Sequence, residues 1–468
     1  MNQTKRNKNT VSADDDVLMK ATVKNYYPII ITLILGSVLP LMDTTMIGVL
    51  IPSIREDFGS SVTTLQWITM VYTLSAAVAI PLSAWFVRCK GDRFVWLVGL
   101  IIFTLGSLCC GLSVSLRGLI LARMVQGIGA GIIITVMQSI LLHAIGRTHF
   151  KTAMTSIAVP AVIIPIISPI VTSSLLSVVH WHWLFLLNIP IATMAVLLAL
   201  YYLPNDSKTE ATPLDITGFI LYGMSIVAVI YGLSSLNYLN NPAQPSILII
   251  GAFLTVALVL PFRFIKHCAI KRSPLINIAL FKIPSFRTSC SLLLLSSLCF
   301  YTGLFFLPLF FIEQFHYSLF TASILLGING IGALLSRAYM QALSAKFGVS
   351  KTSILSVASV LIGTLPLCLN ELANVPWLVS CCMLIRGAGI GLLTLIAMTH
   401  AYQDVPSNQV ADASAWSRIL TMLGASIGAA SMTFAQLFST ADSTHFYEHL
   451  LIIMILFGVL CFIPAKTL

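Results

Sequence analysis

The stretch PIIITLILGSVLPLMDTTMIGVL, residues 28–50, carries a single charged side chain, Asp43. At about 1.5 Å of rise per helical residue it is long enough to cross a hydrocarbon core of about 30 Å. Comparable apolar runs recur along almost the whole chain, and only 9% of its 468 residues are Asp, Glu, Lys or Arg. A soluble domain carries roughly 25% charged residues. The sequence therefore predicts an all-α protein with helices embedded in a lipid bilayer.

Charged and turn residues divide the chain into fourteen expected membrane-spanning helices. The expected ranges are 28–50, 64–87, 94–114, 118–142, 152–177, 183–203, 215–235, 246–265, 287–312, 319–343, 352–370, 375–402, 411–437 and 446–465. Because the number is even, both termini are expected on the same side of the membrane.

The distribution of basic residues predicts which side that is. Most of the 26 Lys and Arg residues lie in the N-terminal tail and in every second connection, whereas only Arg55 and Arg117 lie in the connections between them. Basic residues next to spans are retained in the cytoplasm. We therefore expect cytoplasmic termini and a plasma membrane location, the inner membrane of a bacterial cell. Orientation and attraction to anionic lipid account for the net charge of +10, so no nucleic-acid partner is expected.

Two segments of the chain indicate an internal repeat. Leu121-Ala-Arg123-Met-Val-Gln126-Gly127-Ile-Gly129 resembles Leu384-Ile-Arg386-Gly387-Ala-Gly389, and the two fall on helices of the same direction. A long basic connection, 263–287, separates eight expected spans from six. Two bundles joined by a cytoplasmic linker follow, and repeats of this kind are typical of transporters whose substrate binds between them.

A few charges remain inside the apolar runs, where each needs a partner or a water-filled cavity. They are Asp43, Arg123, Arg337, Arg386 and Arg418. Helical rise places Asp43 about 12 Å and Arg123 about 9 Å from the same membrane surface, so the two can meet. We interpret Asp43, Arg123, Gln126 and Arg386 as proton-coupling or cavity residues; the alternative for Asp43 and Arg123 is a permanent structural ion pair. Arg337 and Arg418 are given no role.

No other pattern indicates catalysis, a metal or a cofactor. His180-Trp181-His182-Trp183 could be a metal pair, but its place at a membrane boundary favours an interfacial aromatic belt. The ten cysteines lack ligand spacing and are interpreted as packing residues. Without an assembled nucleophile and base, the chain is not expected to be an enzyme.

At several of these segments the chain resembles the 14-helix drug:proton antiporter family of the major facilitator superfamily, most nearly its MdtD-like branch. The matching segments are Leu41-Met-Asp43-Thr-Thr45, Leu121 to Gly129, Trp181-His-Trp183-Leu-Phe-Leu-Leu-Asn188-Ile-Pro190, Leu214-Asp215-Ile-Thr-Gly218 and Leu423-Gly424-Ala-Ser-Ile-Gly428. The resemblance implies alternating access by two six-helix bundles, an inserted pair of helices, and proton-driven efflux with Asp43 and Arg123 at the coupling site. The implied domains are a cytoplasmic tail at 1–27, an N-terminal bundle at 28–203, the inserted pair and linker at 204–285, and a C-terminal bundle at 286–468.

Two motifs depart from the family pattern. In the gating loop after the second span, Arg88 replaces an acid, and Gly91, Asp92 and Arg93 follow it; Arg88 and Asp92 could form an i, i+4 pair if the segment is helical. The antiporter motif of the fifth span keeps Pro165 and Pro169 but has lost glycines, and bulk at Ile164 is expected to hinder close helix contact.

The sequence therefore favours a secondary transporter that exports amphipathic organic molecules in exchange for protons. One alternative is a transporter of a dedicated metabolite or siderophore, including uptake, motivated by the eroded glycine motif. A second is a membrane sensor that transports nothing. The expected partners are a small-molecule substrate, protons and membrane lipid, and a monomer is the working expectation.

Overall fold

The computed structural model describes residues 13–204, 213–235, 247–271, 274–406, 409–438 and 443–467. Helices make up nearly all of this part of the chain, and no strand occurs in it. Eleven of its helices are long and apolar enough to span a membrane, and the shorter stretches Ile163–Leu176 and Ile216–Gly232 are apolar as well. With α13 (Val410–Phe438) they account for the fourteen expected spans. The predicted all-α membrane fold is confirmed.

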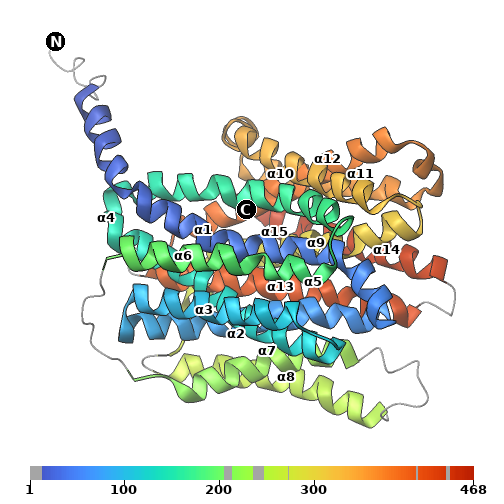
Figure 1. Ribbon diagram of the computed structural model, residues 1–468, viewed down its shortest axis with the longest axis horizontal. Coiled ribbons are helices and arrows are strands. Elements are labelled where there is room, and N and C mark those ends of the chain that lie inside the picture. Colours follow the sequence, from blue (N-terminus) through green and yellow to red (C-terminus); the bar gives the residue numbers. More distant parts are fainter. Residues whose placement is uncertain are drawn as a thin grey trace.

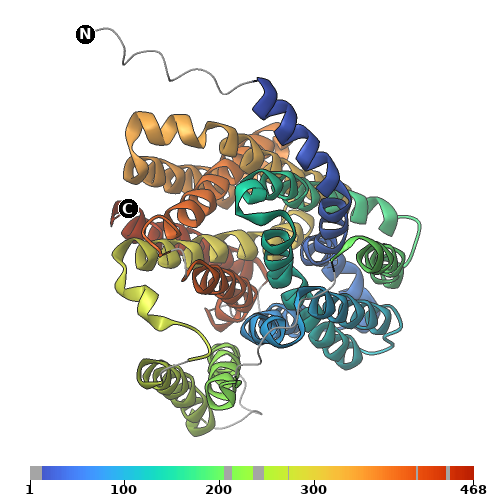
Figure 2. The same cartoon turned by 90° about the vertical axis from the view of Figure 1, so that its left-hand side faces the viewer.

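The first bundle and the inserted pair occupy the first part of the chain. Their helices are α1 (Ala13–Phe58), α2 (Val62–Lys90), α3 (Asp92–Gly111), α4 (Leu116–Leu176), α5 (Trp181–Leu186), α6 (Asn188–Tyr202), α7 (Ile216–Ser235) and α8 (Ile247–Ile270). Figures 1 and 2 show α7 and α8 packed on each other at one side of the main body.

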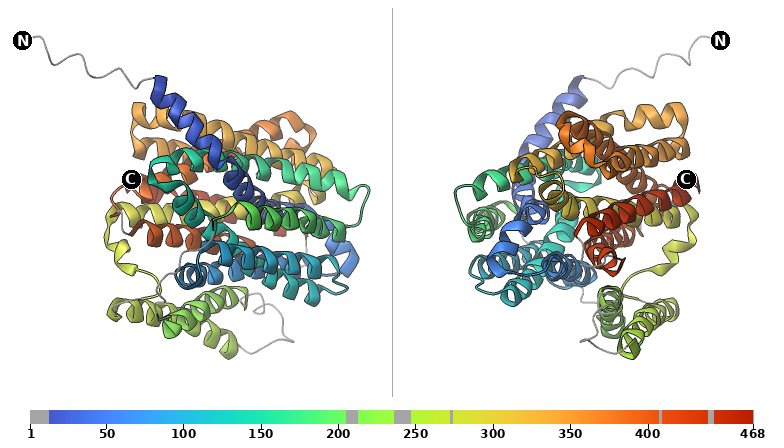
Figure 3. Two further views of the ribbon diagram at one scale, coloured as in Figure 1. Left: turned by 60° about the vertical axis from the view of Figure 1, so that its left-hand side comes forward. Right: turned by 90° about the vertical axis from the view of Figure 1, so that its right-hand side faces the viewer.

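The second bundle follows a short linker. Its helices are α9 (Pro284–Glu313), α10 (Leu319–Phe347), α11 (Val349–Thr364), α12 (Pro376–Ala401), α13, α14 (Ser443–Leu460) and α15 (Phe462–Thr467), with 3-10 turns at Ile278–Lys282, Leu365–Cys368 and Asn370–Asn374. In Figure 3 the helices of both bundles form one body, and the inserted pair lies below it in both views.

Two helix boundaries differ from the expectation. The first span was expected to begin at residue 28, but α1 already begins at Ala13. A connection was expected between residues 142 and 152, whereas α4 is helical throughout and forms two arms, Leu116–Leu141 and Ile163–Leu176. Residues 143–151 contain one glycine and no proline, so local sequence does not break the helix there. The predicted start of the tail, residues 1–12, lies outside the described residues.

Matching local signals build the two halves. Ser61 caps α2 by accepting a hydrogen bond from the Thr64 N–H at 3.3 Å, and Ser318 caps α10 in the same way from Thr321 at 3.1 Å. A single glycine then joins α2 to α3 and α10 to α11: Gly91 has φ 87° and Gly348 has φ 82°. Only glycine adopts this conformation without strain. The internal repeat is therefore present in caps and joints as well as in the arginine motifs.

The glycines of α4 bring its first arm into close contact with two neighbours. Gly127 and Gly131 lie against Tyr72 and Ala76 of α2, and Gly129 lies against Phe103 of α3. Helices in a bilayer associate through such close packing because lipid gives them no hydrophobic driving force. Close packing of helices therefore accounts for the contacts that these glycines make.

Asp215 ties the inserted pair to the linker. Its carboxylate accepts hydrogen bonds from the Gly218 N–H at the start of α7, from the Lys271 Nζ at 2.7 Å and from the Leu275 N–H, and His267 at the end of α8 lies 3.0 Å away. Burial alone would raise its pKa, but the hydrogen bonds from Lys271, Gly218 and His267 outweigh it and lower the pKa to about 2.

The first prediction concerns the glycine packing of α4. A methyl group added at Gly131 would lie 2.9 Å from the Ala76 Cα, and this backbone atom has no free rotation to relieve the clash. Gly131→Ala should therefore destabilise the protein by about 1–3 kcal/mol, measured as a lower midpoint of thermal unfolding in detergent. Gly251→Ala in α8 is the matched control, because a Cβ there meets nothing within 4 Å. Equal midpoints for the two variants would contradict the packing described.

The second prediction concerns Asp215. A carboxyl whose pKa is lowered from about 3.9 in the unfolded chain to about 2 stabilises the fold above pH 4 and loses that effect as the pH falls toward 2. Asp215→Asn keeps a capping side chain but removes the charge, so it should cost about 2 kcal/mol at pH 7, and this difference should shrink between pH 4 and pH 2. Thermal midpoints across this range test it, with the exposed Asp404→Asn as control. If the difference in thermal midpoint between the wild type and Asp215→Asn does not change with pH, the charge of Asp215 does not contribute to stability.

Candidate functional site

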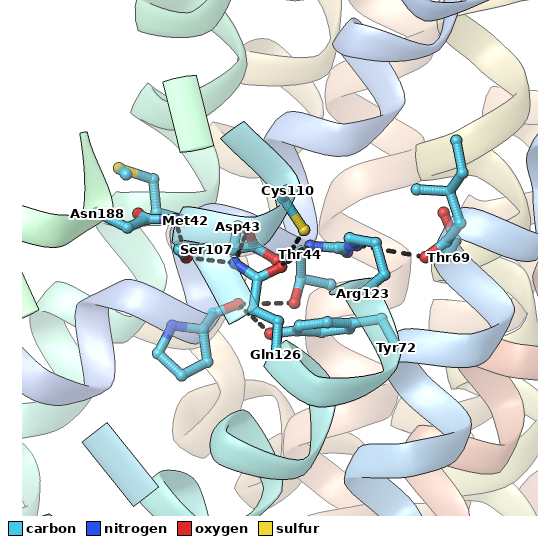
Figure 4. A network of polar contacts seen from close by, with 12 residues as sticks. Met42, Asp43, Thr44, Thr69, Tyr72, Ser107, Cys110, Arg123, Gln126 and Asn188 are labelled. Atoms are coloured by element: carbon cyan, nitrogen blue, oxygen red, sulfur yellow. Dashed lines mark hydrogen bonds and ion pairs between the residues drawn. The ribbon is translucent and has the colours of Figure 1, made fainter. Parts of the chain in front are cut away.

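Asp43 and Arg123 meet inside the N-terminal bundle. Asp43 comes from α1 and Arg123 from the first arm of α4, and both side chains are fully buried. The Arg123 Nη1 donates a hydrogen bond to the Asp43 Oδ2, which makes a buried ion pair (Figure 4). Helical counting placed the two residues at similar depths, and the packing of α1 on α4 brings them into contact.

Gln126 links this pair to α3 and α6. Its Nε2 donates to the Asp43 Oδ1 at 2.9 Å and to the Ser107 Oγ at 2.7 Å, and its Oε1 accepts from Arg123 at 2.6 Å. Asn188 of α6 donates to the same Ser107 hydroxyl at 3.2 Å. Both Asp43 oxygens therefore have donors, as a carboxylate that is withdrawn from water requires.

Aromatic rings and a backbone carbonyl complete the surroundings of Arg123. Its Cζ lies 4.1 Å from the centroid of the Tyr72 ring and 5.7 Å from that of Phe185. The Nε donates to the Ile68 carbonyl at 3.3 Å, while the buried Nη2 donates to no protein acceptor in the described part of the chain. One donor of the guanidinium is thus available for another acceptor.

Arg386 is the counterpart of Arg123 in the C-terminal bundle. It is 1% exposed, and it donates to the Cys299 carbonyl at 2.8 Å and to the Asn329 Oδ1 at 3.2 Å. Its guanidinium lies over Gly303 of α9. Arg386 was predicted to be a proton-coupling or cavity residue; it is enclosed among α9, α10 and α11, and its hydrogen-bond partners are neutral. It does not belong to the Asp43 network.

The gating-loop residues lie at the end of α2 and the start of α3. Gly91, with φ 87°, separates the two helices, so Arg88 and Asp92 are not on one continuous helix as an i, i+4 pair would require. Arg88 instead interacts electrostatically with Asp412 of α13, in the other bundle. Arg93 donates to the Leu200 carbonyl of α6 at 2.7 Å. An acidic residue of the other bundle therefore lies within electrostatic range of Arg88.

Pro165 and Pro169 lie in the second arm of α4, beside the Asp43 site. Proline lacks an N–H, so each removes one backbone hydrogen bond from the helix. Between them, the Ser168 hydroxyl donates to the Met42 carbonyl at 3.1 Å, one residue before Asp43. Movement of this arm would therefore shift the backbone of α1 next to Asp43.

The bulk that replaced glycine in this arm is accommodated by α10. Ile166 and Ile170 face Gly330 and Gly327, and a Cβ at Gly327 would lie 2.9 Å from the Ile170 Cδ1. The expectation for Ile164 itself stays a prediction, because these contacts are made by Ile166 and Ile170. The small residues that a close helix contact needs are present on the opposite side of it.

A polar contact between the bundles lies at the end of the molecule where α1 and α9 terminate, called the far end below. Arg55 of α1 pairs with Glu313 of α9, and the Tyr447 hydroxyl of α14 donates to the same carboxylate. Phenylalanines of α9, among them Phe305 and Phe306, pack there with residues of α1 such as Leu50. Arg55 had only been assigned to a connection, because one sequence does not show which bundle its side chain meets.

The fold agrees with the comparison to a known family. The profile described as Major Facilitator Superfamily matches residues 33–429. The chain belongs to this superfamily and is a multi-pass membrane transporter, not an enzyme.

Several curated relatives cover most of the chain at low identity. A transporter of the same superfamily from Bacillus subtilis, YhcA, is 26% identical over 88% of this chain and 76% of its own length. A candidate multidrug resistance protein, MdtD, from Cronobacter sakazakii is 26% identical over 84% of this chain and 82% of its own. The multidrug resistance protein B homolog of Mycobacterium tuberculosis is 26% identical over 86% and 74%.

Solved structures show the same fold. A POT family transporter in complex with 5-aminolevulinic acid superposes with a TM-score of 0.66, at 18% identity, over 92% of this chain and 94% of its own. An auto-inhibited POT family peptide transporter gives a TM-score of 0.69 at 12% identity, over 93% and 95%. At these identities the likeness concerns the fold alone.

The third prediction separates the two members of the buried pair. Removing Asp43 leaves a guanidinium that stays charged without its counter-ion, at a cost of about 3–5 kcal/mol. Removing Arg123 leaves a carboxyl that can take up a proton and become neutral. Asp43→Asn should therefore lower the thermal midpoint more than Arg123→Gln does, and the double variant should recover part of the loss. A double variant as unstable as the sum of the two single variants would show that the charges do not interact.

Proposed function

We propose that this transporter exports amphipathic organic compounds in exchange for protons, with Asp43 as the proton carrier and Arg123 and Gln126 as its partners. The buried network of Asp43 is the observation on which the proposal rests. A carboxylate held by a guanidinium and an amide can take up a proton only if water reaches it and the ion pair loosens. Alternating access provides such a step, because it hydrates the site in one conformation and dries it in another.

The contacts around the pair support this coupling. Ser168 connects the proline-containing arm of α4 to α1 beside Asp43, and the free Nη2 of Arg123 offers a donor to an incoming acceptor. At the far end, Arg55, Glu313 and Tyr447 join the two bundles. In the proposed cycle, opening the far end separates these residues, and the gating loop with Arg88 and Asp412 acts at the other end.

The relatives support the substrate class. Two of them are named for multidrug resistance. A substrate class of amphipathic compounds also fits a bundle interface that is built mostly from apolar and aromatic side chains. We further propose a bacterial inner-membrane location with cytoplasmic termini, supported by the basic residues of the tail and alternate connections.

A transport assay in proteoliposomes tests the proposal as the fourth prediction. With a pH gradient imposed, the wild type should move a lipophilic cationic dye such as ethidium, and a pH-sensitive dye should report counter-movement of protons. Asp43→Asn should abolish gradient-driven dye movement and proton movement, because the amide carries no exchangeable acid. Exchange of labelled for unlabelled dye without a gradient should persist, because it needs only the conformational change.

Two variants control this experiment. Asp43→Glu keeps a carboxyl and should retain part of the proton movement, whereas Asp215→Asn removes an acid away from the pair and should leave coupling intact. Unchanged dye-driven proton movement in Asp43→Asn would rule out the coupling role. A wild type that moves no member of a mixed panel of dyes and drugs would rule out broad export.

A further inference from the structure

Three potential metal ligands converge at the far end of the N-terminal bundle. Asp57 lies in the last turn of α1, and His180 and His182 flank the start of α5. One ligand atom from each lies within 4.8 Å of the others. Figure 1 shows α1 running across the molecule toward the side where α5 lies. The sequence showed only the two histidines, because Asp57 is far from them along the chain.

His182 is held in the tautomer that a metal ligand needs. Its Nε2 lies 2.9 Å from the Ser113 carbonyl, which can only accept, so this nitrogen carries the hydrogen. The Nδ1 of the neutral ring then carries a lone pair, and it lies 2.7 Å from the Nδ1 of His180. A histidine that ligates a metal commonly donates its other N–H to a carbonyl in this way.

Asp57 is oriented by a similar contact. The indole N–H of Trp181 donates to its Oδ2 at 3.1 Å, which leaves the Oδ1 directed at the His180 Nε2, 3.9 Å away. His180 is therefore placed between a carboxylate and an imidazole lone pair. Two of the three candidate ligands are thus held by residues outside the set, while the side chain of His180 is 54% exposed.

We propose that Asp57, His180 and His182 bind one divalent transition-metal ion of the Zn²⁺ class. Two imidazoles and a carboxylate suit Zn²⁺, Ni²⁺ or Cu²⁺ and do not suit Mg²⁺ or Ca²⁺, which prefer oxygen ligands. Zn–N bonds of about 2.0–2.1 Å place two tetrahedral nitrogens about 3.3 Å apart. The two rings need to separate only slightly from their present 2.7 Å, and the exposed ring of His180 can supply that movement.

The space beside the ligands can hold the remaining coordination. A cavity of about 360 Å³ is lined by Ser53, Glu56, Asp57 and His180, among others. It is open to solvent, so an aqueous ion can enter, and water or the Glu56 carboxylate can complete a tetrahedral set.

An ion in this position would fasten the end of α1 to the start of α5. Arg55, in the same last turn of α1 as Asp57, makes the contact with Glu313 of the C-terminal bundle. The site therefore adjoins the contact that joins the two bundles at the far end. The ion would hold one partner of that contact in place, which is a further function beyond transport itself.

Metal titration of the full chain tests the site as the fifth prediction. Protein purified in detergent without a polyhistidine tag and stripped with EDTA should bind one Zn²⁺, measured by calorimetry. Co²⁺ in its place should give visible d–d absorption with the intensity of a four-coordinate site. His182→Asn and His180→Asn should each weaken Zn²⁺ binding by about 100-fold, and Zn²⁺ should raise the thermal midpoint of the wild type but not of these two variants.

The control is His316→Asn. His316 is an exposed histidine after the end of α9, and its φ of 54° is one that asparagine tolerates. This variant should bind Zn²⁺ like the wild type. Thermal midpoints in EDTA establish that the variants are folded. Asp57→Asn removes the carboxylate ligand and leaves both histidines in place. If His182→Asn and Asp57→Asn both bind Zn²⁺ as tightly as the wild type, the three residues form an interfacial aromatic and histidine cluster and not a metal site.

Discussion

The ion pair between Asp43 and Arg123 constrains the whole N-terminal bundle. Taking two charges out of water costs several kcal/mol each, and the pair persists only if geometry and additional hydrogen bonds repay this. Gln126, Ser107 and the Ile68 carbonyl supply those bonds from α4, α3 and α2. The helices must therefore approach closely around one point. The glycines of α4 and Gly106 of α3, which lies against Gln126, make that approach sterically possible.

The two bundles share a framework but differ in charge. Serine caps, glycine joints and buried arginines recur at matching places, which indicates a common backbone plan. Yet Arg123 faces a carboxylate, whereas Arg386 faces an amide oxygen and a backbone carbonyl. A carboxylate can take up a proton, whereas an amide oxygen and a backbone carbonyl do not titrate. Among the described residues, the buried arginine of the first half therefore has a titratable partner, and the buried arginine of the second half has neutral ones.

The sequence predicted the elements of this site better than its connections. Asp43 and Arg123 could be paired because each is a lone charge in an apolar helix, and helical rise gives their depths. Ser107 and Asn188 gave no such signal, because single uncharged polar residues are common in membrane helices.

The contacts between the bundles could not be predicted in this way. The role of Glu313 was not predicted because it lies at the end of its helix, where an acidic side chain can reach water. The proximity of Arg88 to Asp412 could not be predicted, because Asp412 lies on a helix far along the chain and no sequence pattern links the two residues. The compensation between Ile166 and Gly330 is likewise visible only when the two helices are seen in contact.

The position of the inserted helices makes the two sides of the molecule unequal. α7 packs on both α2 and α13, and the Tyr222 hydroxyl donates to the Ala77 carbonyl at 2.9 Å, so α7 lies along the line where these helices of opposite bundles touch. The other line of contact runs between the second arm of α4 and α10. A compound dissolved in one leaflet of the bilayer that diffuses toward the transporter therefore meets α7 and α8 at the first seam before it meets the bundles. The inserted helices therefore separate the contact between α2 and α13 from the surrounding lipid. At the contact between α4 and α10, the proline-containing arm of α4 forms one of the two sides.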